Sequence, residues 1–321
     1  MRKIGIGLIG VGRHGRRYLH HLIGDVPHAE LAALCRKRVG ETLDLALADV
    51  PVYGDYRALV AHPAVDAVVV VTAPSLCHTM ALAAIEAGKP ILVEKPLATT
   101  GKEARAMVEA AERAHLVMMT AHTMRFDPTV LLVKEWLPSL GRLREAVFTS
   151  HIEWSSSLVE RTETPVGAML EFGVHLFDLI RFLSGQEVAG VSCIMDRPRS
   201  AGETTAQACL ETDGGIKCSL DIARVNSGRV GSMEWRGDGG AITGDWVRRR
   251  VVRRLHDGTL DERVLEPTPT IVAVLTSFVH ALRTGTAPSV TGLDGCRAVE
   301  LADACYRSAA EGGAAVRPDD V

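Results

Sequence analysis

The residues of this chain best suited to chemistry lie in short stretches, and the first is close to the N-terminus. Three glycines in a G-x-G-x-x-G pattern directly follow the apolar run Ile4–Ile9 and precede a helical pattern. Such glycines let the chain turn tightly and approach a pyrophosphate, and the dipole of the following helix favours the anion. Because of this position, we favour a phosphate-binding turn over a merely structural glycine-rich turn. The candidate contacts are Gly10, Gly12, Arg13, His14 and Gly15.

The second stretch is Glu94-Lys95-Pro96, which follows an apolar run about eighty residues after the glycines. The carboxyl end of a strand is where doubly wound folds bind ligands. Pro96 fixes the backbone after the lysine, so the ammonium group of Lys95 can polarise a carbonyl or stabilise a developing alkoxide. The alternative is a surface lysine in a connecting loop. A nucleotide and a positioned lysine at one sheet edge are typical of an oxidoreductase.

A third candidate pair is Glu171 and His175, which are four residues apart and therefore share one face of a helix. Histidine is the natural proton carrier because its side chain titrates near neutral pH. Glu171 can hold a substrate hydroxyl or orient the imidazole. Taken alone, a histidine on an apolar helix is more often a core residue, so this assignment depends on its context.

Three cations, Arg36, Lys37 and Arg38, follow the apolar segment Glu30–Cys35. A domain specific for NAD would show an acidic residue there, which holds the ribose 2′-hydroxyl. Cations leave that hydroxyl without an acceptor but suit a 2′-phosphate. We therefore expect NADP(H) to be preferred over NAD(H). The alternative is a solvated loop and a protein that accepts both cofactors.

Length and composition limit the possible classes of protein. The chain has 321 residues, 47% of them hydrophobic and 23% charged, which suits two globular domains. A net charge of −3 gives no reason to expect nucleic acid or a membrane surface as partner. Seven cysteines without a C-x-x-C pair argue against a disulfide framework and a zinc site, and no metal is expected. The short apolar N-terminus lacks a cleavage site, so we expect a cytoplasmic protein.

Strand and helix patterns alternate over residues 1–122, which predicts an α/β domain with a parallel, doubly wound sheet. Its helices are expected at Leu76–Ala87, with Ser75 as N-cap, and at Lys102–Ala114, where Thr100 and Glu103 have capping-box spacing. The expected strands are continuous apolar runs, as strands buried on both faces require. They are Ile4–Ile9, Glu30–Cys35, Ala67–Val71, Pro90–Val93 and Val117–Ala121.

Residues 123–321 have a different hydrophobic pattern, typical of an α+β domain with a mostly antiparallel sheet. Several segments alternate apolar and polar residues, the period of half-exposed strands. Asp257-Gly258 is a hairpin signal. The expected strands are Glu145–Glu153, Val188–Met195, Thr205–Thr212, Gly215–Ile222, Arg248–His256 and Thr259–Leu265, and the expected helices are Gly167–Leu183, Thr270–Thr284 and Asp294–Ala310.

With these pieces the chain resembles the glucose–fructose oxidoreductase / inositol dehydrogenase / rhizopine catabolism (Gfo/Idh/MocA) family, from the first strand to the final helix. Its motifs are fairly specific in combination. Besides the glycine pattern and Glu94-Lys95-Pro96 they are Val71-Thr72-Ala73-Pro74-Ser75-Leu76-Cys77-His78, Ala87-Gly88-Lys89, Arg125-Phe126-Asp127-Pro128, Gly173-Val174-His175-Leu176-Phe177-Asp178 and Trp235-Arg236-Gly237-Asp238-Gly239-Gly240.

The resemblance implies a Rossmann domain followed by an α+β domain with a large open sheet, one face of which commonly forms the oligomer interface. A homodimer or homotetramer is therefore expected. It also implies hydride transfer between nicotinamide and a sugar or cyclic polyol, with a cis peptide before Pro96. Lys95 and His175 would then supply the base for the alcohol proton, with Glu171 in support. Two positions depart from the family pattern: Ser75 replaces Asn, and Glu171 replaces Asp.

The resemblance also implies further contacts. Thr72, Pro74, His78 and Glu94 are candidate cofactor contacts, although His78 also suits a purely structural role. The candidate substrate contacts are His122, Met124, Arg125, Trp154 and Asp178, and Asp178 could equally cap local structure.

Two alternative functions and one basic segment remain open. A redox-neutral glycosidase that keeps its nucleotide, or a non-enzymatic nucleotide- or sugar-sensing protein, would use the same fold. Five arginines lie within Arg248–Arg254. Cross-strand ion pairs with the acidic residues near Glu262 are the simpler interpretation. An acidic or phosphorylated substrate is the alternative, and the lack of a basic excess disfavours nucleic acid.

Overall fold

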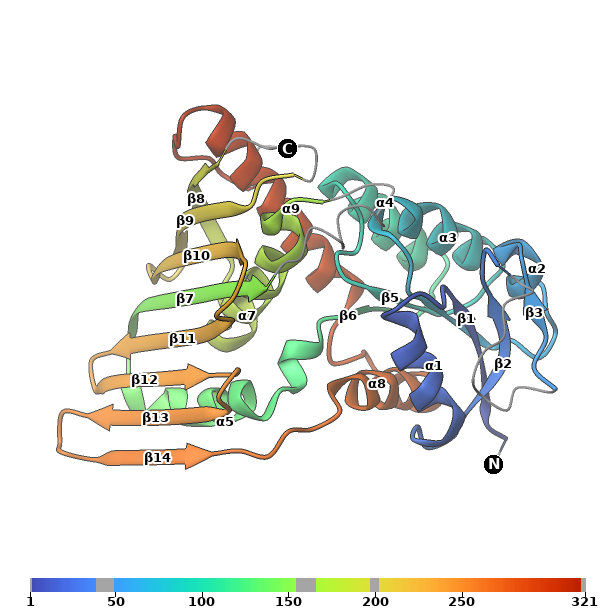
Figure 1. Cartoon of the computed structure of the whole chain (residues 1–321), viewed down its shortest axis with the longest axis horizontal. Helices are drawn as coiled ribbons and strands as arrows, with labels where there is room; N and C mark the ends of the chain where they lie inside the picture. Colours follow the sequence, from blue (N-terminus) through green and yellow to red (C-terminus); the bar gives the residue numbers. More distant parts are fainter. Residues whose placement is uncertain (1, 39–48, 154–165, 197–201, 319–321) are drawn as a thin grey trace. The chain divides into compact units, whose positions relative to one another are not determined.

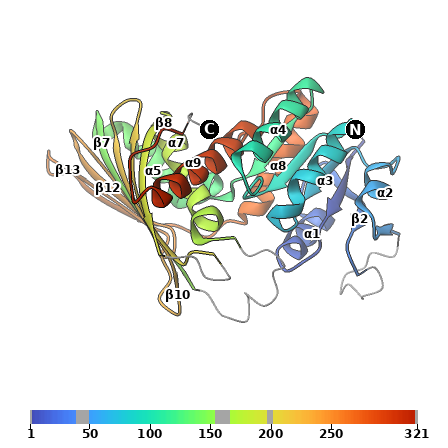
Figure 2. The same cartoon turned by 90° about the horizontal axis from the view of Figure 1, so that it is seen from above.

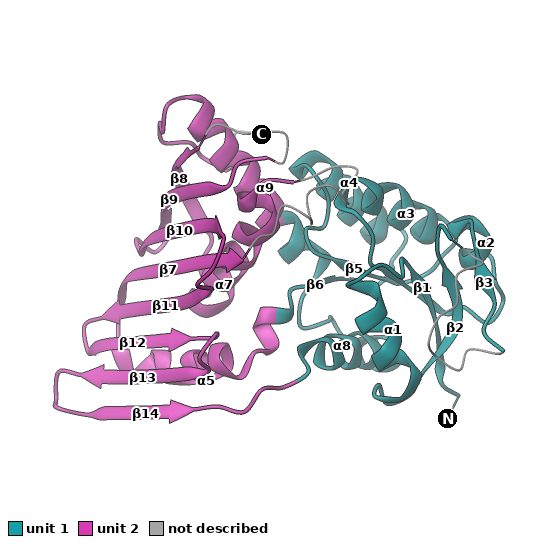
Figure 3. Cartoon of the chain, viewed as in Figure 1, with its two compact units in different colours: residues 1–123, 269–296 teal, residues 124–268, 297–321 magenta. Residues whose placement is uncertain are grey.

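The computed structural model describes residues 2–38, 49–153, 166–196 and 202–318. By contacts these residues form two compact units, residues 1–123 with 269–296 and residues 124–268 with 297–321 (Figure 3). The chain thus returns to the first unit for the helix at 270–284. In the described residues, no helix is both long and apolar enough to cross a membrane.

The first unit is built on a parallel sheet of six described strands in the order β3-β2-β1-β4-β5-β6. The order reverses direction between β1 and β4, which is where doubly wound sheets bind nucleotides. The middle strands are apolar and buried on both faces, as expected from their sequences. The strands are β1 (Ile4–Ile9), β2 (Ala29–Cys35), β3 (Val52–Tyr53), β4 (Ala67–Val70), β5 (Ile91–Glu94) and β6 (Met118–Ala121).

Helices cover both faces of this sheet (Figure 1). On one side lie α2 (Tyr56–Val60), α3 (Pro74–Glu86) and α4 (Gly101–Arg113), and on the other α1 (Gly15–Gly24) and α8 (Thr270–Thr284). The predicted cap of α4 is confirmed, since the Thr100 side chain accepts the Glu103 N–H at 3.2 Å. The predicted Ser75 cap of α3 is wrong. That helix begins two residues earlier than predicted, at Pro74, whose fixed φ and missing N–H suit the first helical position, and Ala73 is its N-cap.

The second unit contains a sheet of eight described strands in the order β14-β13-β12-β11-β7-β10-β9-β8. Its pairings are antiparallel except for β10 with β7. The mostly antiparallel second sheet that the sequence predicts is confirmed. The strands are β7 (Leu143–Glu153), β8 (Val188–Met195), β9 (Thr205–Thr212), β10 (Lys217–Val225), β11 (Val230–Gly237), β12 (Gly240–Asp245), β13 (Arg250–Leu255) and β14 (Leu260–Val264).

Described helices lie on only one face of this second sheet (Figure 2). Buried and exposed residues alternate along β9, as in a half-exposed strand. On the covered face, Phe148 and Trp235 meet edge to face with ring centroids 5.9 Å apart. The helical segments of this part are η1 (Thr123–Phe126), α5 (Pro128–Trp136), η2 (Leu137–Leu140), η3 (Met169–Gly173), α7 (Val174–Ser184) and α9 (Gly292–Ala310).

One helical segment differs in type from its prediction. The sequence predicts a continuous helix over Gly167–Leu183, whereas Met169–Gly173 is a π-helix that runs directly into α7. Apolar spacing does not distinguish the two, because one wider turn leaves the same residues facing the core. Single π-turns occur often at functional sites, and this one carries Glu171.

Candidate active site

The glycine turn connects β1 to α1. The close packing of the backbone requires glycine at two of its positions, Gly10 and Gly15, but not at Gly12. Gly10 has φ +96°, and a Cβ there would overlap the carbonyl oxygen of Val71. A Cβ on Gly15 would overlap the carbonyl oxygen of Gly10. A Cβ on Gly12, by contrast, would meet no described atom within 4 Å. The open space beside Gly12, next to the helix N-terminus, fits the pyrophosphate of a dinucleotide.

Glu94 ties this turn to the end of β5. Its side chain is buried, and its Oε1 accepts the Tyr18 hydroxyl at 2.6 Å and lies 2.8 Å from His14 Nε2. Its Oε2 accepts the backbone N–H of Lys95 at 2.8 Å. His14 and Glu94, two predicted cofactor contacts, therefore bond to each other.

The pKa of Glu94 reflects this set of partners. Burial acts to raise the pKa of Glu94, but the hydrogen bond and charge of His14, the charge of Lys95 and the Tyr18 hydroxyl together lower it. Burial, and then the charge of Glu94, raise the pKa of Tyr18 well above its usual range. Glu94 is therefore an ionised carboxylate and Tyr18 a neutral donor at neutral pH.

Lys95 lies just beyond β5, half-buried, and its peptide bond to Pro96 is cis, as the resemblance implies. Because Ile9, Val70 and Val93 form one row of paired residues, the turn after β1, the segment after β4 and Lys95 all lie at the same sheet edge. The segment after β4 supplies the half-buried candidates Thr72, Pro74 and His78.

The three cations predicted to select the cofactor follow β2, the neighbour of β1, and so lie at this edge too. Arg36 is buried, and its backbone N–H donates to the carbonyl of Tyr53 at 2.9 Å. The side chains of Lys37 and Arg38 are exposed. The structure thus collects the predicted cofactor residues at the carboxyl ends of four strands of the first unit.

The second unit carries Glu171 in η3 and His175 in the first turn of α7, both half-buried. Glu171 Oε2 accepts a hydrogen bond from the Arg224 guanidinium at 2.6 Å. The Arg224 side chain, at the end of β10, is only 1% exposed, whereas that of Glu171 is 29% exposed. The guanidinium therefore compensates the charge of a carboxylate that still reaches solvent.

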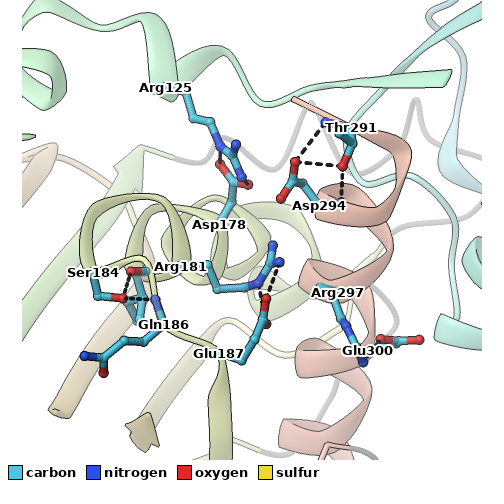
Figure 4. A network of polar contacts seen from close by, with 11 residues as sticks. Arg125, Asp178, Arg181, Ser184, Gln186, Glu187, Thr291, Asp294, Arg297 and Glu300 are labelled. Carbon is cyan, nitrogen blue, oxygen red and sulfur yellow. Dashed lines mark hydrogen bonds and ion pairs between the residues drawn. The ribbon is translucent and has the colours of Figure 1, made fainter. Parts of the chain in front are cut away.

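Arg125 and Asp178, two candidate substrate contacts, form a bidentate ion pair with distances of 2.8 and 2.6 Å (Figure 4). Both side chains are buried, and the Arg125 guanidinium also stacks over Phe182. The ammonium group of Lys134 lies 3.4 Å from the centre of the same ring. Burial and then the charge of Arg125 lower the pKa of Lys134. This pairing gives Asp178 the structural role that its sequence position left open, and a substrate role remains a prediction.

The remaining candidates are less informative. His122 is 1% exposed and Met124 is half-buried. Trp154 lies outside the described residues.

Sequence reasoning missed three further residues: Tyr18 in the first unit, and Arg224 and Glu203 in the second. Tyr18 reads as an ordinary core residue of an amphipathic helix, and Arg224 as an exposed cation at a strand end. Glu203 is 4% exposed and accepts the Met169 N–H at 2.8 Å. None of these roles has a local sequence signal, because each depends on a partner far away in the chain.

Two arginines of the arginine-rich segment, Arg250 and Arg253, form ion pairs within their own hairpin. Arg250 and Glu262 form a bidentate pair at 2.7 Å, and Arg253 reaches Asp261 at 2.6 Å. The prediction of cross-strand ion pairs is confirmed for these arginines. Arg248 precedes the strand, which begins at Arg250, and pairs with Asp245 at 3.4 Å.

Comparison with known proteins places this geometry in context. The model of an oxidoreductase family with an NAD-binding Rossmann fold matches residues 4–122, and the model of the GFO/IDH/MocA C-terminal domain matches residues 130–243. The chain is 31% identical to inositol 2-dehydrogenase 2 of Saccharopolyspora erythraea, covering 97% of this chain and 94% of the relative. It is 30% identical to 1,5-anhydro-D-fructose reductase of Ensifer adhaerens, covering 80% and 81%.

A solved structure has the same fold. It is scyllo-inositol dehydrogenase from Lactobacillus casei with bound NAD(H) and scyllo-inositol, which matches with a TM-score of 0.83 over 99% of this chain and 100% of the other at 20% identity.

Proposed function

Because this chain belongs to the Gfo/Idh/MocA family of NAD-binding oxidoreductases, we propose that it transfers a hydride between a nicotinamide cofactor and a sugar, inositol or related polyol. The observation that carries the proposal is the shared sheet edge of the open Gly12 turn and Lys95. The names of the relatives, an inositol dehydrogenase and an anhydrofructose reductase, support a polyhydroxylated ring as substrate.

The bound nicotinamide would supply the hydride acceptor or donor, and the residues of the chain would supply the proton chemistry. We assign Lys95 to the substrate oxygen, where an ammonium stabilises developing alkoxide charge. His175 takes the alcohol proton in oxidation and returns it in reduction. Glu171 holds a substrate hydroxyl. Gly10, Gly12, Gly15 and the N-terminus of α1 hold the pyrophosphate.

We further propose that NADP(H) is preferred and that NAD(H) is accepted more weakly. Support comes from Arg36, Lys37 and Arg38 at the end of β2, where a 2′-phosphate would lie in a dinucleotide-binding sheet. Alanine at Lys37 and Arg38 should weaken binding of NADPH more than that of NADH. Lys102→Ala, which removes an exposed cation from α4, is the control for net charge.

The test is a fluorescence titration with NADPH and NADH on nucleotide-free protein, followed by a polyol panel read at the nicotinamide absorbance band. Selective NADPH binding with turnover of a sugar or inositol is the expected result. Preference for NADH would contradict the cofactor assignment but not the reaction. Nucleotide that stays bound without exchange, together with glycoside hydrolysis, would replace the dehydrogenase by the redox-neutral alternative.

A further inference from the structure

We propose that Arg224 is the positioning residue of the substrate helix, since it fixes the Glu171 carboxylate as an oriented acceptor for a substrate hydroxyl. This inference rests on the proposed polyol dehydrogenase function. It concerns a residue that touches neither cofactor nor substrate and acts through Glu171.

The contacts of Arg224 join three segments of the second unit. One terminal nitrogen donates to Glu171 Oε2 at 2.6 Å and to the carbonyl of Val166 at 2.5 Å. The backbone N–H of Arg224 donates to the carbonyl of Thr204 at 2.8 Å. The guanidinium is thus held against the start of the π-helical segment and cannot follow Glu171 into solvent.

A second carboxylate fixes the backbone at the same place. Glu203 Oε1 accepts the N–H of Met169 and the hydroxyl of Tyr306, at 2.8 and 2.9 Å. A Cβ at Gly167 would overlap the Glu203 carboxylate, so the close approach requires glycine there. Burial, and then the charge of Glu203, raise the pKa of Tyr306, which therefore remains a neutral donor. The helix start is rigid, so the position of the Glu171 carboxylate depends on its own contacts.

The length of the Glu171 side chain explains why an ion pair with Arg224 would matter for the position of the carboxylate. Glu171 has one more methylene than the aspartate usual in the family, and a longer chain has more rotamers to restrict. A charge-assisted hydrogen bond from a buried guanidinium restricts them and leaves a carboxylate that remains 29% exposed. A fixed acceptor discriminates strongly against a substrate that lacks the matching hydroxyl.

The test compares Arg224→Met, Glu171→Gln and the double variant in steady-state kinetics. The substrate is whichever of myo-inositol, scyllo-inositol and D-glucose the wild type oxidises fastest. Each single change should lower kcat/KM for the polyol by about 10–100-fold, the usual effect of a misplaced group. The dissociation constant of the nucleotide should be unchanged. The double variant should be no worse than either single variant. Losses that multiply, or an unaffected Arg224→Met, would overturn the proposal.

The matched control is Arg181→Met, in α7, the helix into which η3 runs. Arg181 is also largely buried, and it pairs with Glu187 through two 2.7 Å bonds, well away from Glu171 in the chain (Figure 4). The Arg181→Met change should leave kcat/KM for the polyol unchanged. If Arg224→Met does not fold, Glu171→Asp serves with Arg224 intact. The shorter carboxylate should no longer reach the guanidinium, and activity should fall about tenfold. Wild-type activity in that variant contradicts the proposal.

Failure of the proposed dehydrogenase function can be distinguished from failure of the positioning role of Arg224. If the wild type oxidises no polyol with either nucleotide, the function is wrong, and a crystal structure of Arg224→Met decides the positioning. A displaced Glu171 carboxylate supports it, and an unmoved carboxylate overturns it.

Discussion

At the scale of single residues, Glu94 of the first unit is a buried carboxylate whose hydrogen bonds connect several parts of the candidate cofactor site. One buried carboxylate receives three hydrogen bonds, from α1, from the glycine turn and from the backbone of Lys95. Its sequence neighbours predict that it belongs to a cofactor site, but they do not predict that its oxygens bond within the protein. Its hydrogen bonds hold the glycine turn and Lys95 in fixed relation.

Glu94 should make the stability of the fold depend on pH. The pKa of Glu94 is lowered on folding, so its ionised form stabilises the fold at pH values above the unfolded pKa, about 4.3. That contribution is lost as the pH falls through the lower folded pKa. Glu94→Gln should cost about 1–3 kcal/mol at pH 7 and flatten the loss of stability below pH 4. Urea unfolding at both pH values measures this.

The control for this prediction is Glu109→Gln, which removes an exposed helical ion pair with Arg113. Such pairs contribute less than about 0.5 kcal/mol. If Glu94→Gln were no more destabilising than this control, the clamping role of Glu94 would be wrong.

The Arg125–Asp178 pair gives a second residue-scale prediction. Asp178→Asn leaves a buried guanidinium without its carboxylate, which should cost about 3–5 kcal/mol. Glu187→Gln breaks a bidentate pair whose carboxylate is exposed, and should cost less than about 1 kcal/mol. Thermal unfolding of both variants tests the ranking, and equal costs would show that burial does not decide it.

At the scale of elements, the glycine turn should separate folding from binding. Gly15→Ala forces a Cβ onto the carbonyl of Gly10 and should destabilise the chain by more than about 2 kcal/mol. The Cβ of Gly12→Val would meet no described atom within 4 Å, so this variant should retain the melting temperature and lose nucleotide affinity at least tenfold. A Gly12→Val variant that binds nucleotide normally would contradict the pyrophosphate site.

The elements also show which features the sequence encodes locally. The parallel strands and the Thr100 cap could be predicted, because continuous apolar runs and capping spacings are local patterns. Two features could not be predicted. The π-turn at Met169–Gly173 leaves the apolar pattern intact, and Arg224 acquires its role from a residue 53 positions away. For the candidate site, the sequence predicts which residues take part but not how their side chains pair.

At the scale of the whole molecule, we propose self-association as a homodimer or homotetramer through the uncovered face of the second sheet. A cavity of about 400 Å³ opens on this sheet, lined by residues that include Ile194, Cys209 and Ser219. Ile194 is 58% exposed, a large apolar side chain for a solvent face. Residence in the cytoplasm likewise remains a prediction.

Ile194→Glu should lower the mass of the assembly measured by analytical ultracentrifugation, because it places charge on the apolar face. Ile23→Glu, at a 46% exposed position on α1, is the matched control and should leave the mass unchanged. A monomeric wild type, or an equal effect of both changes, would remove this face as the interface.

The most direct test of the whole account is a comparison of wild type with Lys95→Ala, in which polyol-dependent reduction of the nicotinamide and nucleotide affinity are measured on the same samples. We expect turnover to fall by about 10³-fold or more, as for loss of a group that stabilises the transition state, with the nucleotide dissociation constant nearly unchanged. Near-normal turnover in Lys95→Ala would contradict the assignment of this chain as an oxidoreductase that works through Lys95.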